Sequence, residues 1–91
     1  TTDILKNKGV FMKRIGTISI FIENRESANK VNEILSNYGD IIISRMGIPY
    51  REKQLSVIVL IVDATNEEMG ALSGLIGNLK DVSVKTAVKK S

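Results

Sequence analysis

Cysteine, histidine and tryptophan are absent from this chain of 91 residues. Without thiols and imidazoles, the chain has no disulfide, no zinc finger, no cysteine nucleophile and no histidine general base. Its serines have no histidine to activate them, and no glycine-rich phosphate-binding loop occurs. We therefore expect a protein that is not an enzyme, with no catalytic residue, no metal site and no cofactor.

Long apolar runs are lacking as well. No stretch of about 18 apolar residues occurs, so we expect no membrane-spanning helix. The first residues lack the apolar segment and the cleavage site of a signal peptide, which favours a cytoplasmic protein. We interpret residues 1–11 as an N-terminal extension, either disordered or added in cloning, and residues 12–91 as a single domain.

The composition that remains is that of a globular domain. Hydrophobic residues make up 43% and charged residues 25% of the chain, and the net charge is +3. A chain of this length has a thin core, so it depends on a partner more often than a large domain does. The mildly basic charge permits an acidic partner but does not require one.

Two periodicities predict the secondary structure. Ile18, Ile20 and Ile22 recur at the period of two of a strand, whereas other apolar residues recur at helical spacing. Thr65 and Glu68 have the spacing of a capping box, which marks the start of a helix. We predict strands over 13–23, 41–48, 55–62 and 82–88, one helix between the cap residues Asn24 or Ser27 and Gly39, and a second over 66–79.

The resulting order, βαββαβ, is that of a ferredoxin-like α+β fold. Right-handed crossovers place both helices on one face of an antiparallel four-stranded sheet, which makes a two-layer sandwich. Pro49 lacks a backbone donor, so the second strand should stop pairing there or should lie at an edge of the sheet.

The third strand is apolar on both faces, which a two-layer monomer does not explain. Such strands are normally buried on both faces, and burying one valine or isoleucine stabilises by about 1.5–3 kcal/mol. We therefore predict that the helix-free face packs on another subunit through Val57, Val59 and Ile61. A register error of one residue would exchange this set for the other face of the strand, which carries Ile58, Leu60 and Val62.

Gly70, Gly74 and Gly77 share one face of the second helix. Each glycine inside a helix costs roughly 0.8–1 kcal/mol relative to alanine. A face of this kind permits close packing of a neighbouring helix or a ligand. Alternatively, the glycines face solvent, or Gly77 ends the helix early.

Candidate ligand-binding residues lie in the turn after the first strand and around the central hairpin. Backbone amides at a helix N-terminus can hold an anionic group, and the residues that flank the hairpin add donors. The alternative is ordinary helix capping and a solvated hairpin tip. The candidates are Glu23, Asn24, Arg25, Arg45, Tyr50 and Arg51.

A basic group forms if the first and fourth strands are antiparallel neighbours, because Lys13, Arg14, Lys89 and Lys90 then meet at one end. Base-stacking platforms for nucleic acid need aromatic side chains, and the third strand has none. We therefore do not expect this chain to bind nucleic acid by itself.

Three segments resemble a known family: Arg45-Met-Gly-Ile-Pro-Tyr-Arg51, Leu60-Ile-Val-Asp-Ala-Thr-Asn-Glu-Glu68 and Gly70-Ala-Leu-Ser-Gly-Leu-Ile-Gly77. From Met12 to Lys89 the chain resembles the iron-only hydrogenase system regulators. The resemblance implies an ACT-like domain, similar to the C-terminal domain of nickel-responsive repressors. Domains of this kind oligomerise and sense small ligands, amino acids among them. Those repressors hold nickel with histidine and cysteine, so nickel sensing by that route is excluded here.

We therefore expect a cytoplasmic regulatory domain that forms a homo-oligomer, either a dimer or a tetramer, and binds a small-molecule effector such as an amino acid. One alternative is a protein-interaction module without a small ligand. The other is a nucleic-acid-binding transcriptional regulator that uses the basic end.

Overall fold

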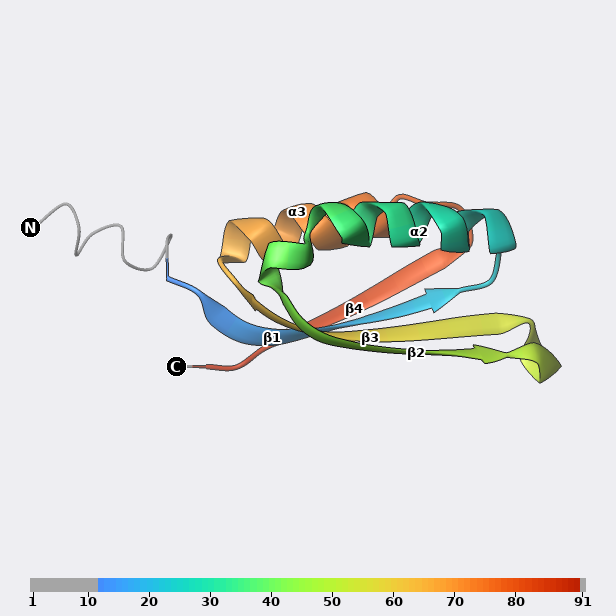
Figure 1. The fold of residues 1–91 in the computed structure, drawn as a ribbon, viewed down its shortest axis with the longest axis horizontal. Helices are drawn as coiled ribbons and strands as arrows, with labels where there is room; N and C mark the ends of the chain where they lie inside the picture. Colours follow the sequence, from blue (N-terminus) through green and yellow to red (C-terminus); the bar gives the residue numbers. More distant parts are fainter. Residues whose placement is uncertain (1–11, 91) are drawn as a thin grey trace, which may run out of the picture.

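A computed structural model of the chain describes residues 12–90 (Figure 1). The expected extension, residues 1–11, therefore lies outside the described residues. The elements follow the predicted order, with two short 3₁₀ turns added. They are β1 (Arg14–Ile22), α2 (Arg25–Asn37), η1 (Gly39–Ile41), β2 (Ile42–Tyr50), η2 (Arg51–Lys53), β3 (Leu55–Ala64), α3 (Asn66–Gly77) and β4 (Val82–Val88).

The four strands form one sheet in the order β2-β3-β1-β4, and every neighbouring pair is antiparallel. Both helices cover the same face of this sheet, and no helix within residues 12–90 covers the other (Figure 1). The fold is therefore the ferredoxin-like two-layer α+β sandwich that the sequence predicted. Strands β2 and β4 are its two edges.

The core lies between the sheet and the helices. Alternate residues of β1 and β3 point into it, and the apolar stripes of α2 and α3 close it from above. Burial on this side removes the apolar side chains from water, which is the main favourable contribution to folding. The side chains with no exposed surface are Ile18, Ile20, Val31, Leu60, Val62, Leu72 and Ile76.

Several element boundaries differ by one or two residues from the sequence prediction. Strand β2 does not stop at residue 48 but continues to Tyr50, with Pro49 paired to Ser56. Proline is tolerated here because β2 lies at the edge of the sheet. The second alternative predicted for Pro49, an edge strand, is therefore confirmed. Helix α3 ends at Gly77 and not at Leu79, so the early end considered for Gly77 is confirmed.

The helix starts agree with the capping signals. Asn24 caps α2, because its side-chain Oδ1 accepts hydrogen bonds from the backbone N–H groups of Glu26 (2.9 Å) and Ser27 (3.3 Å). The capping box of α3 is complete: Glu68 N–H donates to Thr65 Oγ1 at 3.1 Å, and Thr65 N–H donates to Glu68 Oε1 at 2.9 Å.

A buried glycine in β1 sets how closely its neighbours approach. A Cβ atom added at Gly16 would meet Met69 Cε of α3 and would lie 2.9 Å from the backbone oxygen of Ala87 in β4. The sequence reasoning missed this residue. Its signal was a lone glycine in a strand of otherwise β-branched residues, a pattern that marks close approach of another backbone.

Candidate functional site

The face of the sheet without helices exposes apolar side chains. In β3, Ile58, Leu60 and Val62 are buried beneath the helices. The alternate residues Val57 and Val59 are only partly buried. Ile61 is 41% exposed. Since side chains alternate between the two faces of a strand, the structure places Val57, Val59 and Ile61 on the open face.

Strand β2 extends this apolar surface. Met46 lies opposite Val59, and Ile48 lies opposite Val57. Directly opposed residues of antiparallel strands share one face, so these side chains form two adjacent rows. Met46 is 69% exposed and Ile48 is 54% exposed. We refer to Met46, Ile48, Val57, Val59 and Ile61 as the open apolar face.

The interface predicted from the sequence did not include Met46 and Ile48 of β2. Met46, Ile48 and Tyr50 alternate with Gly47 and Pro49, which is the period of two expected for one face of a strand.

The turn between β1 and α2 is held by hydrogen bonds to the turn between α3 and β4. Asn24 Nδ2 donates to Asp81 Oδ2 at 3.4 Å, and Ser27 Oγ donates to the backbone oxygen of Lys80 at 2.7 Å. The backbone N–H of Glu23 donates to the oxygen of Asp81 at 2.9 Å. The backbone N–H groups of Glu26 and Ser27 already donate to Asn24 Oδ1. An anion would therefore have to displace this oxygen before it could bind them.

The other candidate residues lie elsewhere. Arg45, in the middle of β2, donates from Nη2 to Asn32 Oδ1 at 2.8 Å, which links the strand to α2. Tyr50 OH donates to Glu52 Oε2 at 3.2 Å, and Arg51 begins the 3₁₀ turn at the hairpin tip. Among the hydrogen bonds of residues 12–90, none joins this group to the β1–α2 turn.

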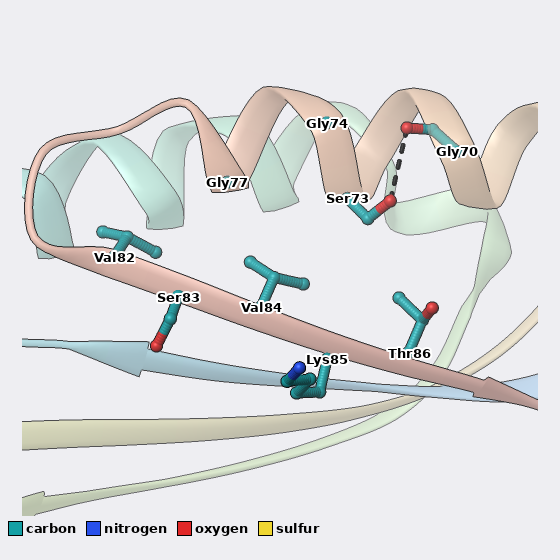
Figure 2. Close-up of a pocket in the computed structure, with 9 residues that line it drawn as sticks. All are labelled: Gly70, Ser73, Gly74, Gly77, Val82, Ser83, Val84, Lys85 and Thr86. Atoms are coloured by element: carbon teal, nitrogen blue, oxygen red, sulfur yellow. Dashed lines mark hydrogen bonds between the residues drawn. The ribbon is translucent and has the colours of Figure 1, made fainter.

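The glycine face of α3 borders a groove beside β4 (Figure 2). The groove has a volume of about 520 Å³. A Cβ atom added at Gly70 or Gly74 would meet no other described atom within 4 Å. The side chains of Val82, Val84 and Thr86 point towards α3 in this view (Figure 2). We call this the glycine groove, lined by Gly70, Ser73, Gly74, Gly77, Val82, Ser83, Val84, Lys85 and Thr86.

The basic residues meet as their predicted pairing requires. Strands β1 and β4 are antiparallel neighbours, and the backbone N–H of Lys89 donates to the oxygen of Ile15 at 2.9 Å. Lys13, Arg14, Lys89 and Lys90 therefore lie at one end of the sheet. The Arg14 Nε atom is buried there without a hydrogen-bond partner among the described residues.

Glu68 stabilises the start of α3 through the capping box. The backbone hydrogen bond from Thr65 is the main reason that the pKa of Glu68 is lowered, and the Thr65 hydroxyl and the positive charge of Lys13 act in the same direction. Residues 12–90 contain no group of three or more acidic side chains placed to hold a metal ion. In the same part of the chain, no helix is both long enough and apolar enough to cross a membrane.

Comparison with known proteins gives one family and several similar folds. The model of the TM1266-like family, described as "Iron-only hydrogenase system regulator, putative", matches residues 14–86. An uncharacterized protein of Thermotoga maritima, TM1266, has 35% sequence identity and a TM-score of 0.83 over 86% of this chain and 99% of that chain. A search of curated proteins found no match.

More distant structures share the fold alone. A "putative glycine cleavage system transcriptional repressor" has 12% identity and a TM-score of 0.64, covering 87% of this chain and 47% of that one. The C-terminal domain of MgtC from Mycobacterium tuberculosis has 7% identity and a TM-score of 0.65, covering 85% and 88%. The fold is therefore ACT-like, as the sequence resemblance implied.

Proposed function

Because the chain belongs to the TM1266-like family of iron-only hydrogenase system regulators, we propose that it regulates by ligand-dependent self-association. In this proposal, copies of the chain assemble through the open apolar face, and a small-molecule effector changes the population of the assembly. A ligand acts in this way only when it binds one state more tightly than the other. The chain performs no chemical step of its own.

The exposure of the open apolar face is the observation that carries this proposal. Met46 and Ile48, at 69% and 54% exposure, lie beside Val57, Val59 and Ile61 on a surface that the other described residues, 12–90, leave uncovered. Contiguous exposed apolar patches mark interaction sites in soluble proteins. Two copies stacked through this face would bury both patches at once, since a two-fold interface uses the same surface twice.

For the effector, we propose a free amino acid at the turn between β1 and α2. Glu23 and Arg25 flank the cap residue Asn24, and both are exposed. An amino acid carries one ammonium and one carboxylate, which these two side chains complement in charge. The related fold of a glycine cleavage system repressor supports a regulatory role for such a domain.

Two variants test the assembly. In Val59→Lys, a charge stands in the centre of the open apolar face, and burying an unpaired charge is strongly unfavourable. In the matched control, Leu75→Lys, the same change is made on α3, where the side chain is 49% exposed. We expect native mass spectrometry to show multiples of 10.0 kDa for the unchanged protein and the control, and a smaller assembly for Val59→Lys.

The same spectra test the effector. Protein purified without added ligands should either carry extra mass or gain it on addition of an amino acid mixture, and the retained mass identifies the compound. The double variant Glu23→Gln, Arg25→Gln changes the two residues beside Asn24. This variant should no longer retain the added mass of the amino acid. A bare monomer under all conditions would refute the proposal and would favour a protein-interaction module that serves a different partner.

A further inference from the structure

Met46 differs from the rest of the open apolar face in exposure and in chemistry. At 69% exposure, it is the most exposed large hydrophobic side chain of the described residues. The other four members of the face are valines and isoleucines, whose side chains are saturated hydrocarbons. A methionine thioether, in contrast, takes up one oxygen atom to become a polar sulfoxide. Within this surface, Met46 is therefore the side chain that an oxidant can modify.

Strand propensity does not account for a methionine at this position. β-branched and aromatic residues fit a pleated, half-buried surface best, and the other members of the open apolar face follow that rule. Met46 lies directly opposite Val59, between the ends of the two apolar rows. A branched residue would suit the strand better there and would resist oxidation, so the thioether is the property that distinguishes this position.

The three methionines of the chain differ in how easily an oxidant reaches them. Met69 belongs to the core and is 6% exposed. Met12 is partly buried and precedes β1, outside the open apolar face. Oxidation of the thioether requires contact between the oxidant and the sulfur atom, so Met46 should react before Met69.

We propose that Met46 is an oxidation site that regulates assembly through the open apolar face, with hydrogen peroxide as the oxidant. The Met46 sulfur attacks one peroxide oxygen and the O–O bond breaks. The proton of the transferred oxygen passes to the departing hydroxide, which leaves as water. The sulfur loses two electrons and becomes a sulfoxide, while the peroxide gains them. This inference rests on the proposed function, because it assigns a regulation to the same surface.

The sulfoxide opposes assembly because its oxygen would have no hydrogen-bond donor between two apolar faces. A buried acceptor that loses its water and gains no partner is unfavourable. A two-fold interface uses the same surface of both subunits, so two sulfoxides would have to be buried at once. The oxidised subunit keeps its own core, because Met46 contributes nothing to the helix side of the sheet.

The reaction takes place on the dissociated subunit. The assembly covers Met46, whereas the single subunit leaves it exposed. Peroxide therefore removes free subunits from the equilibrium, and further assemblies dissociate to replace them. Sulfoxide reductases return the thioether, so the modification is reversible and the subunits assemble again.

Treatment of the full chain with hydrogen peroxide tests this inference. Mass spectrometry of the digested protein locates each added oxygen atom, and sedimentation equilibrium measures the dissociation constant of the assembly. We expect oxygen at Met46 before Met69, and a dissociation constant raised by at least on the order of 10-fold. Circular dichroism should show that the treated protein is folded. Methionine sulfoxide reductases should then restore both the mass and the dissociation constant.

Two variants separate Met46 from the other methionines. Met46→Leu lacks the thioether, so peroxide should leave its dissociation constant at the value measured before treatment; Met46→Ile serves the same purpose if the leucine variant does not assemble. Met12→Leu is the matched control, because Met12 lies outside the open apolar face. This control should respond to peroxide as the unchanged protein does.

The outcomes distinguish this inference from the proposed function. An untreated protein that is monomeric refutes the proposed function, and the oxidation switch with it. If the untreated protein assembles and its dissociation constant stays within about twofold after Met46 is oxidised, the proposed function stands and the switch alone is overturned. The same holds if Met69 is oxidised first, if the Met46 variants lose their assembly on treatment, or if reduction fails to restore it.

Discussion

Replacement of Gly16 by alanine should destabilise the fold, although alanine is the smallest change available. The added Cβ would meet Met69 Cε and would lie 2.9 Å from the Ala87 backbone oxygen. The methionine can move, because the atom in question ends a flexible side chain. The carbonyl belongs to β4, so relief there requires the strand itself to shift.

The expected magnitude follows from two opposing effects. Overpacking of a well-packed site typically costs about 1–3 kcal/mol. Alanine has less conformational freedom than glycine in the unfolded chain, which stabilises the folded state by about 0.4–1 kcal/mol. We therefore expect a net destabilisation of about 1–2 kcal/mol, which is a large share of the stability of a small domain.

Gly47→Ala provides the matched control in another strand. Its Cβ would lie 3.5 Å from Ile58 Cγ1 and 3.6 Å from the Val57 oxygen, which are ordinary contacts. This variant should be neutral or slightly more stable. Urea denaturation followed by circular dichroism, at one fixed subunit concentration because assembly contributes to stability, compares the two. A Gly16→Ala protein as stable as Gly47→Ala would refute the close approach of β1, α3 and β4.

Two further changes test the core and the helix cap. Leu72→Ala, at a side chain with no exposed surface, should cost about 2–5 kcal/mol in urea denaturation, whereas Leu75→Ala on the exposed side of α3 should stay within about 0.5 kcal/mol. The pKa of Glu68 is lowered in the folded state, so its charged form contributes stability above the ordinary glutamate pKa, and that stability is lost as the pH falls through the lowered value. Glutamine keeps the oxygen that accepts from Thr65 N–H but lacks the charge, so Glu68→Gln should be less stable than the unchanged protein at neutral pH, and the difference should shrink in acid. A constant difference across the titration would contradict the contribution of the Glu68 charge to stability.

Periodicity was sufficient to predict most of the fold. The alternation of Ile18, Ile20 and Ile22 fixed the core face of β1, because a period of two has one solution once a face is buried. The caps at Asn24 and Thr65 fixed the helix starts, because those side chains bond amides within their own first turn. Signals of this kind are local, so a single sequence contains them.

The features that the sequence did not predict depend on contacts between distant segments. The close approach at Gly16 involves Met69 and Ala87, which only the folded topology brings beside β1. The six candidate ligand residues are near one another only in part, since Arg45 bonds to Asn32 in α2 while Tyr50 and Arg51 lie at the hairpin. Charge and residue type identified these six candidates, but not where the folded chain places them.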